Sequence, residues 1–185
     1  VGKVLNALDE AGLRDETIVI FTSDHGFHLG EHDFWAKVSL RDESSQVPLI
    51  LSVPGKKPAI CHSFVELLDL YPTLSALCGL EAQPRLQGED VSALLDDPER
   101  SVRDTAFCVA PMRKGFLLRD DEWAYLQYGE QAENGIELFD VKKDPKQYDN
   151  LAKKKQYQPV VRAFQKKLAA KLAAARDNDL DGRKK

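Results

Sequence analysis

The sequence predicts an α/β fold. It combines the C-terminal part of a parallel-sheet domain with a small α+β domain, which has an antiparallel sheet and a C-terminal helix. Two short, continuous apolar runs, at residues 17–22 and 47–52, predict strands covered on both faces, as in a parallel sheet. After about residue 103, short strand-like runs alternate with turn signals, and one long amphipathic pattern follows. We therefore predict two domains, residues 1–102 and residues 103–185.

The first predicted domain opens with a helix. Apolar residues recur at helical spacing from Val4 to Ala11, and Gly12 follows as a C-cap. After the two strands, residues 64–70 predict a helix, Pro72 a break, and the residues up to Gly79 more helix. Residues 80–102 are polar and rich in turn formers, so we expect a connector with one short helical turn in its VSALL segment.

The second predicted domain contains four short strands and one helix. The runs FCVAPMR, GFLLRD, EWAYLQY and IELFDV are separated by Lys-Gly, Asp-Asp and Asn-Gly turn signals, which favour an antiparallel sheet. The helix is expected from about Gln158 to Arg176 and should pack on that sheet. Its apolar stripe consists of Val160, Val161, Phe164, Leu168 and Leu172.

Composition narrows the class of protein. The chain has a net charge of −4, yet residues 142–185 hold 14 Lys and Arg against 5 Asp and Glu. We interpret this basic end as a solvated helix face and expect no nucleic-acid partner. No run is long enough to predict a membrane span. Cys61, Cys78 and Cys108 show neither a disulfide framework nor a CxxC motif, and we expect them to be buried.

The chemistry of the sequence is concentrated in the segment TSDHG, which directly follows the first predicted strand. Ligands of open α/β sheets bind beyond the carboxyl ends of the strands. Asp24 and His25 offer an oxygen and a nitrogen that can bind a divalent cation. Lys37 can reach an anion beside that cation, and the pair would stabilise charge on a tetrahedral ester.

Other interpretations of the same residues stay open. An Asp at the end of a strand can simply cap the next turn. His28 and His32 are expected as loop residues or as the wall of a substrate pocket, with Phe34 beside them. The histidines at 25, 28 and 32 would together suit zinc, although the intervening glycines argue against a single helix presenting them.

Five segments in order resemble the sulfatases of the alkaline phosphatase superfamily, particularly the iduronate-2-sulfatase group. They are TSDHGFHLGEHDFWAK, ESSQVPLILSVPG with Gln46 where Arg is usual, DLYPTLSALCGL, LQGEDVSALL and ELFDVKKDPKQYDNLA. The resemblance covers about residues 1–175. It implies that Asp24 and His25 are metal ligands, usually for calcium, and that Lys37 binds the sulfate group. It also suggests that Glu43 fixes the loop after Lys37.

The resemblance also implies parts that this sequence does not contain. The family's nucleophile is a formylglycine made from a C/S-x-P-x-R motif, and it would precede Val1, as would a further pair of metal-binding aspartates. Cys108 approaches that motif, but the following proline stands one place too late, so we interpret Cys108 as a strand residue. We therefore expect a C-terminal fragment of a sulfatase that is inactive alone and that self-associates through under-covered apolar residues.

Three functions remain open from the sequence. The first is hydrolysis of sulfate esters, with a sulfated saccharide as a possible substrate. The second is a phosphodiesterase or phosphatase of the same superfamily, and the third is a non-catalytic binding module that kept the fold. The resemblance alone suggests a secreted, periplasmic or lysosomal location. The segment Asp177–Gly182 resembles the opening of an EF-hand calcium loop, although we expect a frayed tail there.

Overall fold

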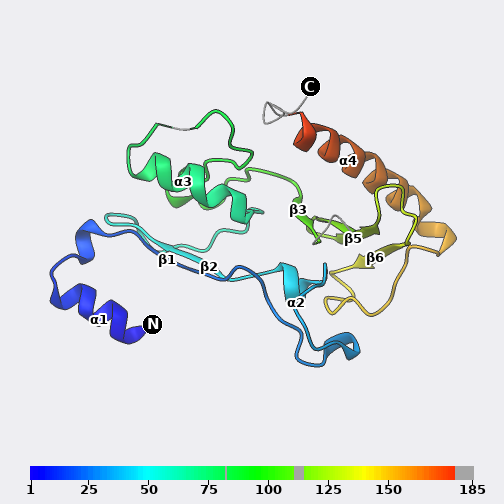
Figure 1. The fold of residues 1–185 in the computed structure, drawn as a ribbon, viewed down its shortest axis with the longest axis horizontal. Helices are drawn as coiled ribbons and strands as arrows, with labels where there is room; N and C mark the ends of the chain where they lie inside the picture. The colour runs from blue at the N-terminus through cyan, green and yellow to red at the C-terminus, as the bar shows by residue number, and fades with distance from the viewer. Residues whose placement is uncertain (82, 111–114, 178–185) are drawn as a thin grey trace, which may run out of the picture.

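The computed structural model describes residues 1–81, 83–110 and 115–177, which form an elongated molecule with one sheet in each half (Figure 1). The first half holds a two-stranded sheet, and the second half holds a four-stranded sheet with a long helix. The helices and strands are α1 (Gly2–Glu10), β1 (Val19–Thr22), α2 (Asp42–Ser45), β2 (Leu49–Ser52), α3 (Leu70–Leu77), β3 (Ala106–Val109), β4 (Gly115–Arg119), β5 (Trp123–Tyr128), β6 (Ile136–Asp140) and α4 (Gln158–Arg176).

The two predicted strands of the first half are present, but they pair antiparallel to each other. The sequence predicted strands of a parallel sheet, and it did not predict this antiparallel pairing of one with the other. A parallel pair would need a long crossover, usually a helix. Here the connection is a loop with the four-residue α2, which returns the chain in the opposite direction. Phe21 lies opposite Ile50, and both side chains are exposed on one face of the pair.

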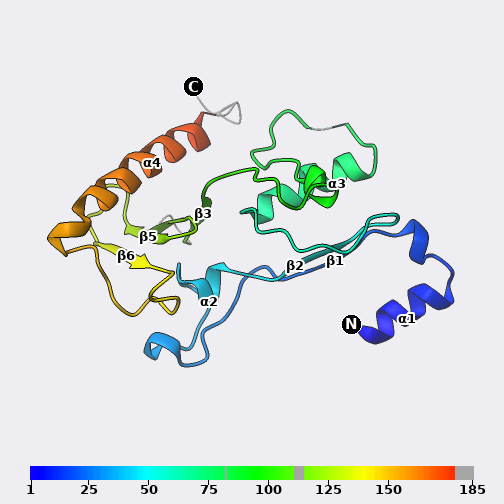
Figure 2. The ribbon, with the colours of Figure 1, turned by 180° about the vertical axis from the view of Figure 1, so that it is seen from behind.

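The helices of the first half agree with the sequence except at one proline. Helix α1 ends as predicted, and Gly12 follows with a φ of 69°. The predicted break at Pro72 is wrong, because Pro72 lies in the first turn of α3. N–H groups in the first turn of a helix have no partner within the helix, so proline, which lacks this group, costs no hydrogen bond there. The irregular part comes earlier, in the 3-10 turn η3 (Leu67–Asp69). Figure 2 shows α3 along one side of the β1–β2 pair.

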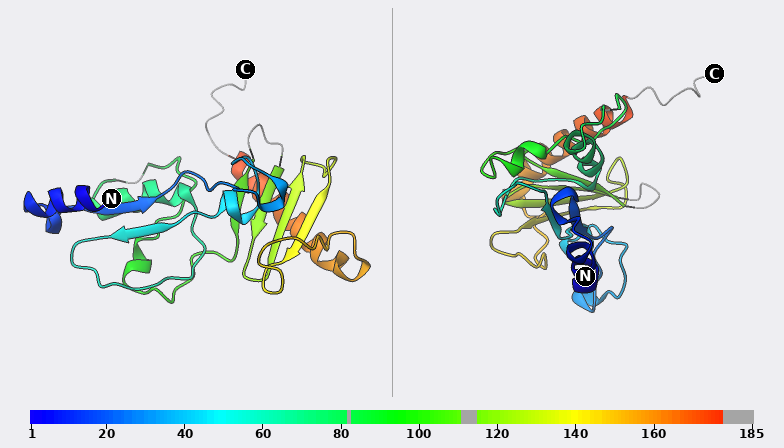
Figure 3. Two further views of the ribbon diagram at one scale, coloured as in Figure 1. Left: turned by 90° about the horizontal axis from the view of Figure 1, so that it is seen from below. Right: turned by 90° about the vertical axis from the view of Figure 1, so that its left-hand side faces the viewer.

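The second half follows the prediction closely. Its strands form an antiparallel meander in the order β3-β4-β5-β6, and α4 has the predicted limits. Helix α4 packs on one face of the sheet, across which it runs in Figure 3. The stripe residues Val161, Phe164 and Leu168 are buried against side chains of that face. Those side chains are Phe116, Leu118, Tyr125 and Leu138.

The opposite face of this sheet is covered by a residue from the first half of the chain. Leu40 is 2% exposed and packs with Leu117, Leu126 and Phe139. It comes so close to Gly115 that a Cβ there would lie 2.8 Å from a Leu40 methyl carbon. The residues just after Lys37 are therefore built into the core of the second half, although our predicted domain boundary near residue 102 assigns them to the first.

The cysteines differ from the expectation. Cys61 and Cys78 are exposed, so the prediction that they are buried is wrong for these two. Cys108 lies half-buried in β3, where burial raises the pKa of its thiol and makes it a poor nucleophile. Apart from Asp177, the EF-hand-like segment Asp177–Gly182 lies outside the residues that the structure describes. No helix within the described ranges is long and apolar enough to cross a membrane.

Candidate active site

Asp24 and His25 lie just beyond the end of β1, where the sequence places them. The Nδ1 atom of His25 lies 2.8 Å from the carbonyl oxygen of Gly26. Because a carbonyl oxygen only accepts, Nδ1 donates in this contact, and in the neutral ring the lone pair is then on Nε2. That Nε2 lies 3.4 Å from Oδ2 of Asp24. A ring nitrogen and a carboxylate oxygen, both able to bind a metal ion, therefore lie next to each other.

The local backbone holds this arrangement in place. The Asp24 carboxylate accepts a hydrogen bond from the N–H of His25 at 3.1 Å. Gly26 donates its N–H to the carbonyl of Ser44 at 2.9 Å, which closes a loop of 17 intervening residues. A Cβ at Gly26 would collide with the backbone carbonyl of Glu43. The glycine is thus required for the close approach of these two chain segments.

Lys37 lies on the same closed loop. His28 donates its N–H to the carbonyl of Ala36 at 2.9 Å, directly before Lys37. The Lys37 side chain is exposed, and in the described part of the chain it makes no hydrogen bond or ion pair. A cation without a counter-ion on a braced loop is available to an external anion.

The two other histidines of the loop are more enclosed. His28 is fully buried, its Nδ1 donates to the carbonyl of Glu31 at 3.3 Å, and its Nε2 has no partner among the described residues. Nε2 of His32 lies 3.5 Å from Oε1 of Glu43. The His32 ring also packs against the Tyr148 ring, with centroids 4.6 Å apart. Glu43 therefore contacts the loop at His32, before Lys37, whereas the sequence predicted that it fixes the part after Lys37.

A shallow cleft of about 420 Å³ lies beside these histidines. Its wall includes His28, His32 and Phe34, the residues expected near a substrate, together with Val38 and Ser39, which directly follow Lys37. Tyr128 and Ala110 of the C-terminal sheet complete it. The cleft therefore lies between the loop and the second half of the chain, a position that residue spacing does not reveal.

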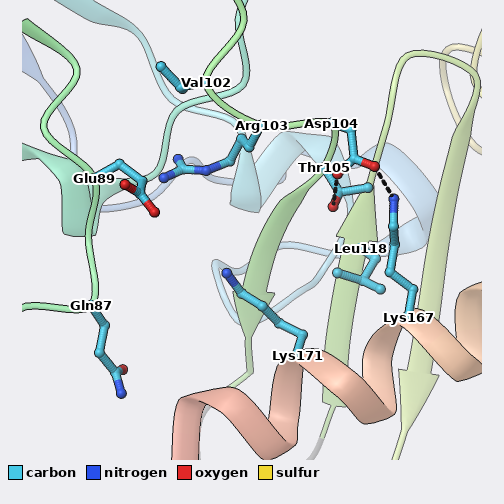
Figure 4. Close-up of a pocket in the computed structure, with 9 residues that line it drawn as sticks. All are labelled: Gln87, Glu89, Val102, Arg103, Asp104, Thr105, Leu118, Lys167 and Lys171. Atoms are coloured by element: carbon cyan, nitrogen blue, oxygen red, sulfur yellow. Dashed lines mark hydrogen bonds and ion pairs between the residues drawn. The ribbon is translucent and has the colours of Figure 1, made fainter.

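A second cleft, of about 310 Å³, lies between α4 and the connector (Figure 4). Its lysines do not form a free cationic site. Lys167 is paired with Asp104 at 2.6 Å, and Lys171 approaches the Phe107 ring at 5.7 Å. Arg103, on the same wall, is paired with the buried Asp69. Because these charges are mostly balanced, we assign no function to this cleft.

The donor set at Asp24 and His25 fits part of a divalent-cation site. A carboxylate oxygen and an unprotonated imidazole nitrogen are both suitable ligands, and the Gly26 carbonyl, hydrogen-bonded to Nδ1, holds the His25 ring in its orientation. The Asp24 side chain is 82% exposed, so further ligands can approach. No group of three or more acidic, His or Cys side chains suited to a metal occurs within the described ranges. His28 and His32 are thus not joined to His25 in a zinc cluster there.

Comparison with known proteins gives the family. A family model described as N-sulphoglucosamine sulphohydrolase, C-terminal, matches residues 30–174. The chain belongs to the sulfatase family. Arylsulfatase K of Mus musculus is 32% identical over 164 residues, which cover 82% of this chain and 30% of that protein. Iduronate 2-sulfatase of Homo sapiens is 39% identical over 111 residues, covering 46% of this chain and 20% of that protein.

Solved structures agree with this sulfatase assignment and confirm the fold class. A 2-O GAG sulfatase superposes with a TM-score of 0.82 at 28% identity, over 94% of this chain and 40% of that chain. A phosphonate monoester hydrolase of Agrobacterium radiobacter gives 0.79 at 27% identity, over 94% and 38%. The chain spans about a third of the length of the curated relatives that it matches, such as arylsulfatase K.

Sequence reasoning found the loop but missed its supports. Asp24 and His25 directly precede the closed loop that carries Lys37, and His28 and His32 line the adjoining cleft. Arg41, at the end of this loop, and its second-half partners Glu137 and Gln147 were not singled out. Their partners lie 96 to 106 residues apart in sequence, so no local pattern marks them. The only signal was the family-like segment that contains Glu137 and Gln147.

Proposed function

We propose that this chain supplies the later part of a sulfate-ester hydrolase site, in which Asp24 and His25 hold a divalent cation and Lys37 binds the sulfate group. The observation that carries the proposal is the proximity of His25 Nε2 and Asp24 Oδ2, 3.4 Å apart, directly before the closed loop that presents the unpaired Lys37. Calcium is the cation we favour, by resemblance to the family. When bound, it would add positive charge beside the ester oxygens.

The residues of this chain have separate tasks in that site. The carbonyl of Gly26 keeps the proton on Nδ1 of His25, which leaves Nε2 free to bind. Lys37 offers its ammonium to the sulfate oxygens and stabilises the charge that develops on them. His28 and His32 would form part of the wall facing the organic part of the ester.

The nucleophile of the proposed reaction is not among these residues. The sequence contains no C/S-x-P-x-R motif. Cys108 lies in strand β3, and burial raises the pKa of its thiol. We therefore expect the 185-residue chain to show no turnover of an aryl sulfate, and to bind calcium weakly, because calcium prefers six to eight ligands. Sulfate release that copurifies with the chain through successive columns would contradict this part of the proposal.

The experiment that tests the function is to read the source gene upstream of the Val1 codon. A C/S-x-P-x-R motif preceded by an Asp pair would support sulfate-ester hydrolysis with a formylglycine. A reading frame that starts close to Val1 would favour a non-catalytic module that kept the fold.

A second candidate function is hydrolysis of phosphate or phosphonate esters. It is favoured by the superposition on the phosphonate monoester hydrolase, which covers 94% of this chain. The two functions differ in the central atom of the ester, sulfur or phosphorus, so the ratio of the two hydrolysis rates in the protein encoded by the whole gene separates them. A Ser or Thr nucleophile outside the C/S-x-P-x-R motif would support this second candidate.

The partners follow from the same proposal. The substrate would be a sulfate ester, and a sulfated saccharide is consistent with the glucosamine disulfate named for one solved relative, which covers 97% of this chain. The exposed Phe21 and Ile50 of the β1–β2 pair offer an apolar face for another polypeptide. In the 185-residue chain, we expect that face to drive self-association.

A further inference from the structure

The segment directly after Lys37 is fastened to the C-terminal sheet. Leu40 lies three residues beyond Lys37 and is fully enclosed in the core of that sheet. Ser39 bridges the interval, because its hydroxyl accepts the N–H of Arg41 at 3.0 Å. The backbone that carries Lys37 is therefore not free to move independently of the second half of the chain.

Arg41 makes the polar contact between the segment after Lys37 and the second half of the chain. Its guanidinium donates to Oε1 of Glu137 at 3.0 Å and to the carbonyl of Gln147 at 2.5 Å, and lies 4.8 Å from the Phe139 ring centroid. The side chains of Arg41 and Glu137 are only 18% and 22% exposed. Charge-assisted bonds in such surroundings are stronger and less screened than surface pairs.

The second oxygen of Glu137 is also held. Tyr128 donates its hydroxyl to Oε2 at 2.9 Å. Burial first, and the neighbouring carboxylate second, raise the pKa of Tyr128 far above its usual range, so the hydroxyl remains a donor. Both carboxylate oxygens of Glu137 therefore accept a hydrogen bond, which fixes the orientation in which the carboxylate binds Arg41.

Gln147 forms a second fastening beside the first. Its side-chain amide donates to Oδ1 of Asp42 at 2.8 Å, and its side-chain oxygen lies 3.4 Å from the N–H of Asp42. Gln147 is 1% exposed and adopts a left-handed φ of 58°. Its neighbour Tyr148 packs on His32, at the other end of the loop. The same short segment of the second half therefore contacts the loop both before and after Lys37.

We propose that Glu137 and Gln147 are positioning residues for Lys37, acting through Arg41 and Asp42. This inference rests on the proposed sulfate-binding role of Lys37, since only that role gives its position a purpose. The Lys37 side chain has no intramolecular partner in the described residues, so its placement depends on the backbone beneath it. Misplacement of a catalytic group by about 1 Å can cost on the order of a hundredfold in rate.

The test measures the backbone at Lys37 directly, by ¹⁵N relaxation on the 185-residue chain. In Glu137→Gln, we expect the order parameters of residues 36–39 to fall from about 0.85 to below about 0.6. Hydrogen exchange at the amides of Gly26 and His28 should speed up roughly tenfold, because a charge-assisted bond is lost. The central strands β4 and β5 should keep their protection. Glu122→Gln, which removes a carboxylate from an exposed turn, is the matched control and should change nothing.

Two further variants separate positioning from general stability. Gln147→Asn introduces a residue that tolerates the left-handed φ of this position, but its side chain is one methylene shorter. It should therefore loosen the same residues while the fold persists. Arg41→Met should reproduce the effect of Glu137→Gln, and the double variant should be no worse than either alone.

The inference is overturned if Glu137→Gln lowers protection in β5 and β6 while residues 36–39 stay ordered. It is also overturned if none of the three single variants changes the order parameters at Lys37. Neither readout involves sulfate or turnover, so these results differ from a failure of the proposed function. That failure would appear instead as an upstream sequence without a nucleophile motif.

Discussion

The two halves of the chain contain similar apolar strands but bury them to very different extents. In the described residues, three buried apolar side chains precede residue 103 and fourteen follow it. Fifteen of the large exposed apolar side chains precede that residue, and only two follow it. Even Leu40, one of the three early buried residues, belongs to the core of the second half.

This difference shows that local sequence can determine where a strand forms, whereas burial of the strand depends on segments that are distant in the sequence. In the second half, α4 covers one face of a four-stranded sheet and Leu40 covers the other, so the core closes within the described chain. The first half offers two strands with no covering layer over Phe21 and Ile50. A two-stranded sheet alone is marginally stable in water. The candidate active site lies between these halves and is braced by the better-packed one.

The largest effect is expected at the junction, where Asp69 of the first half binds Arg103. Asp69 is 1% exposed, and it accepts two bonds from the Arg103 guanidinium and the N–H groups of Glu66 and Glu89. Asp69→Asn breaks this bidentate pair and leaves the buried Arg103 charge with only the more distant Glu66 carboxylate, 4.0 Å away. It should cost about 3–5 kcal/mol in the free energy of unfolding. Urea denaturation measures it. Asp96→Asn, which removes the exposed pair with Lys56, should cost less than about 1 kcal/mol.

The same residue predicts a pH dependence. Burial would raise the pKa of Asp69, but the hydrogen bonds from Arg103 and the two backbone groups outweigh it and hold the pKa below its usual value. A lowered folded pKa contributes stability above about pH 4, and this contribution is lost as the pH falls through the folded pKa. Stability measured against pH should therefore be less steep below pH 4 in Asp69→Asn than in the wild type. Equal slopes would show that Asp69 is not the group responsible.

A matched pair of leucines sharpens the comparison itself. Leu168 is 1% exposed in the core of the second half, whereas Leu68 is 56% exposed in the first. Leu168→Ala should cost about 3–5 kcal/mol, because a cavity remains under α4. Leu68→Ala should stay within about 0.5 kcal/mol, as surface changes do. Comparable losses in the two variants would mean that the exposed residues of the first half are packed in solution.

A smaller effect is expected on self-association. Phe21→Thr combined with Ile50→Thr places residues of high β-propensity in both strands but removes the apolar face of β1 and β2. Sedimentation velocity over a concentration series should show association in the wild-type chain and about tenfold weaker association in the variant, since about 1.4 kcal/mol corresponds to a factor of ten. Identical behaviour of the two proteins would exclude this face as the contact.

The sequence predicted the elements far better than their partners. The limits of α4 and the meander of the second half follow from local periodicity and turn residues, which act over short distances. The antiparallel pairing of β1 with β2, and the helix that continues through Pro72, depend on how the chain returns on itself. For the candidate site, Asp24, His25 and Lys37 were identified by residue type and resemblance. The contact between Arg41 and Glu137 spans 96 residues and has no local signature.

The central claim is that Asp24 and His25 jointly form the metal-binding part of the site, and a calcium titration followed by NMR at the His25 ring tests it most directly. The account predicts saturable shifts of the His25 resonances, with a dissociation constant of about a millimolar or weaker, and their loss in Asp24→Asn. His62, a histidine outside the loop, should not respond. Shifts that persist unchanged in Asp24→Asn, or no response of His25 at any calcium concentration, would contradict it.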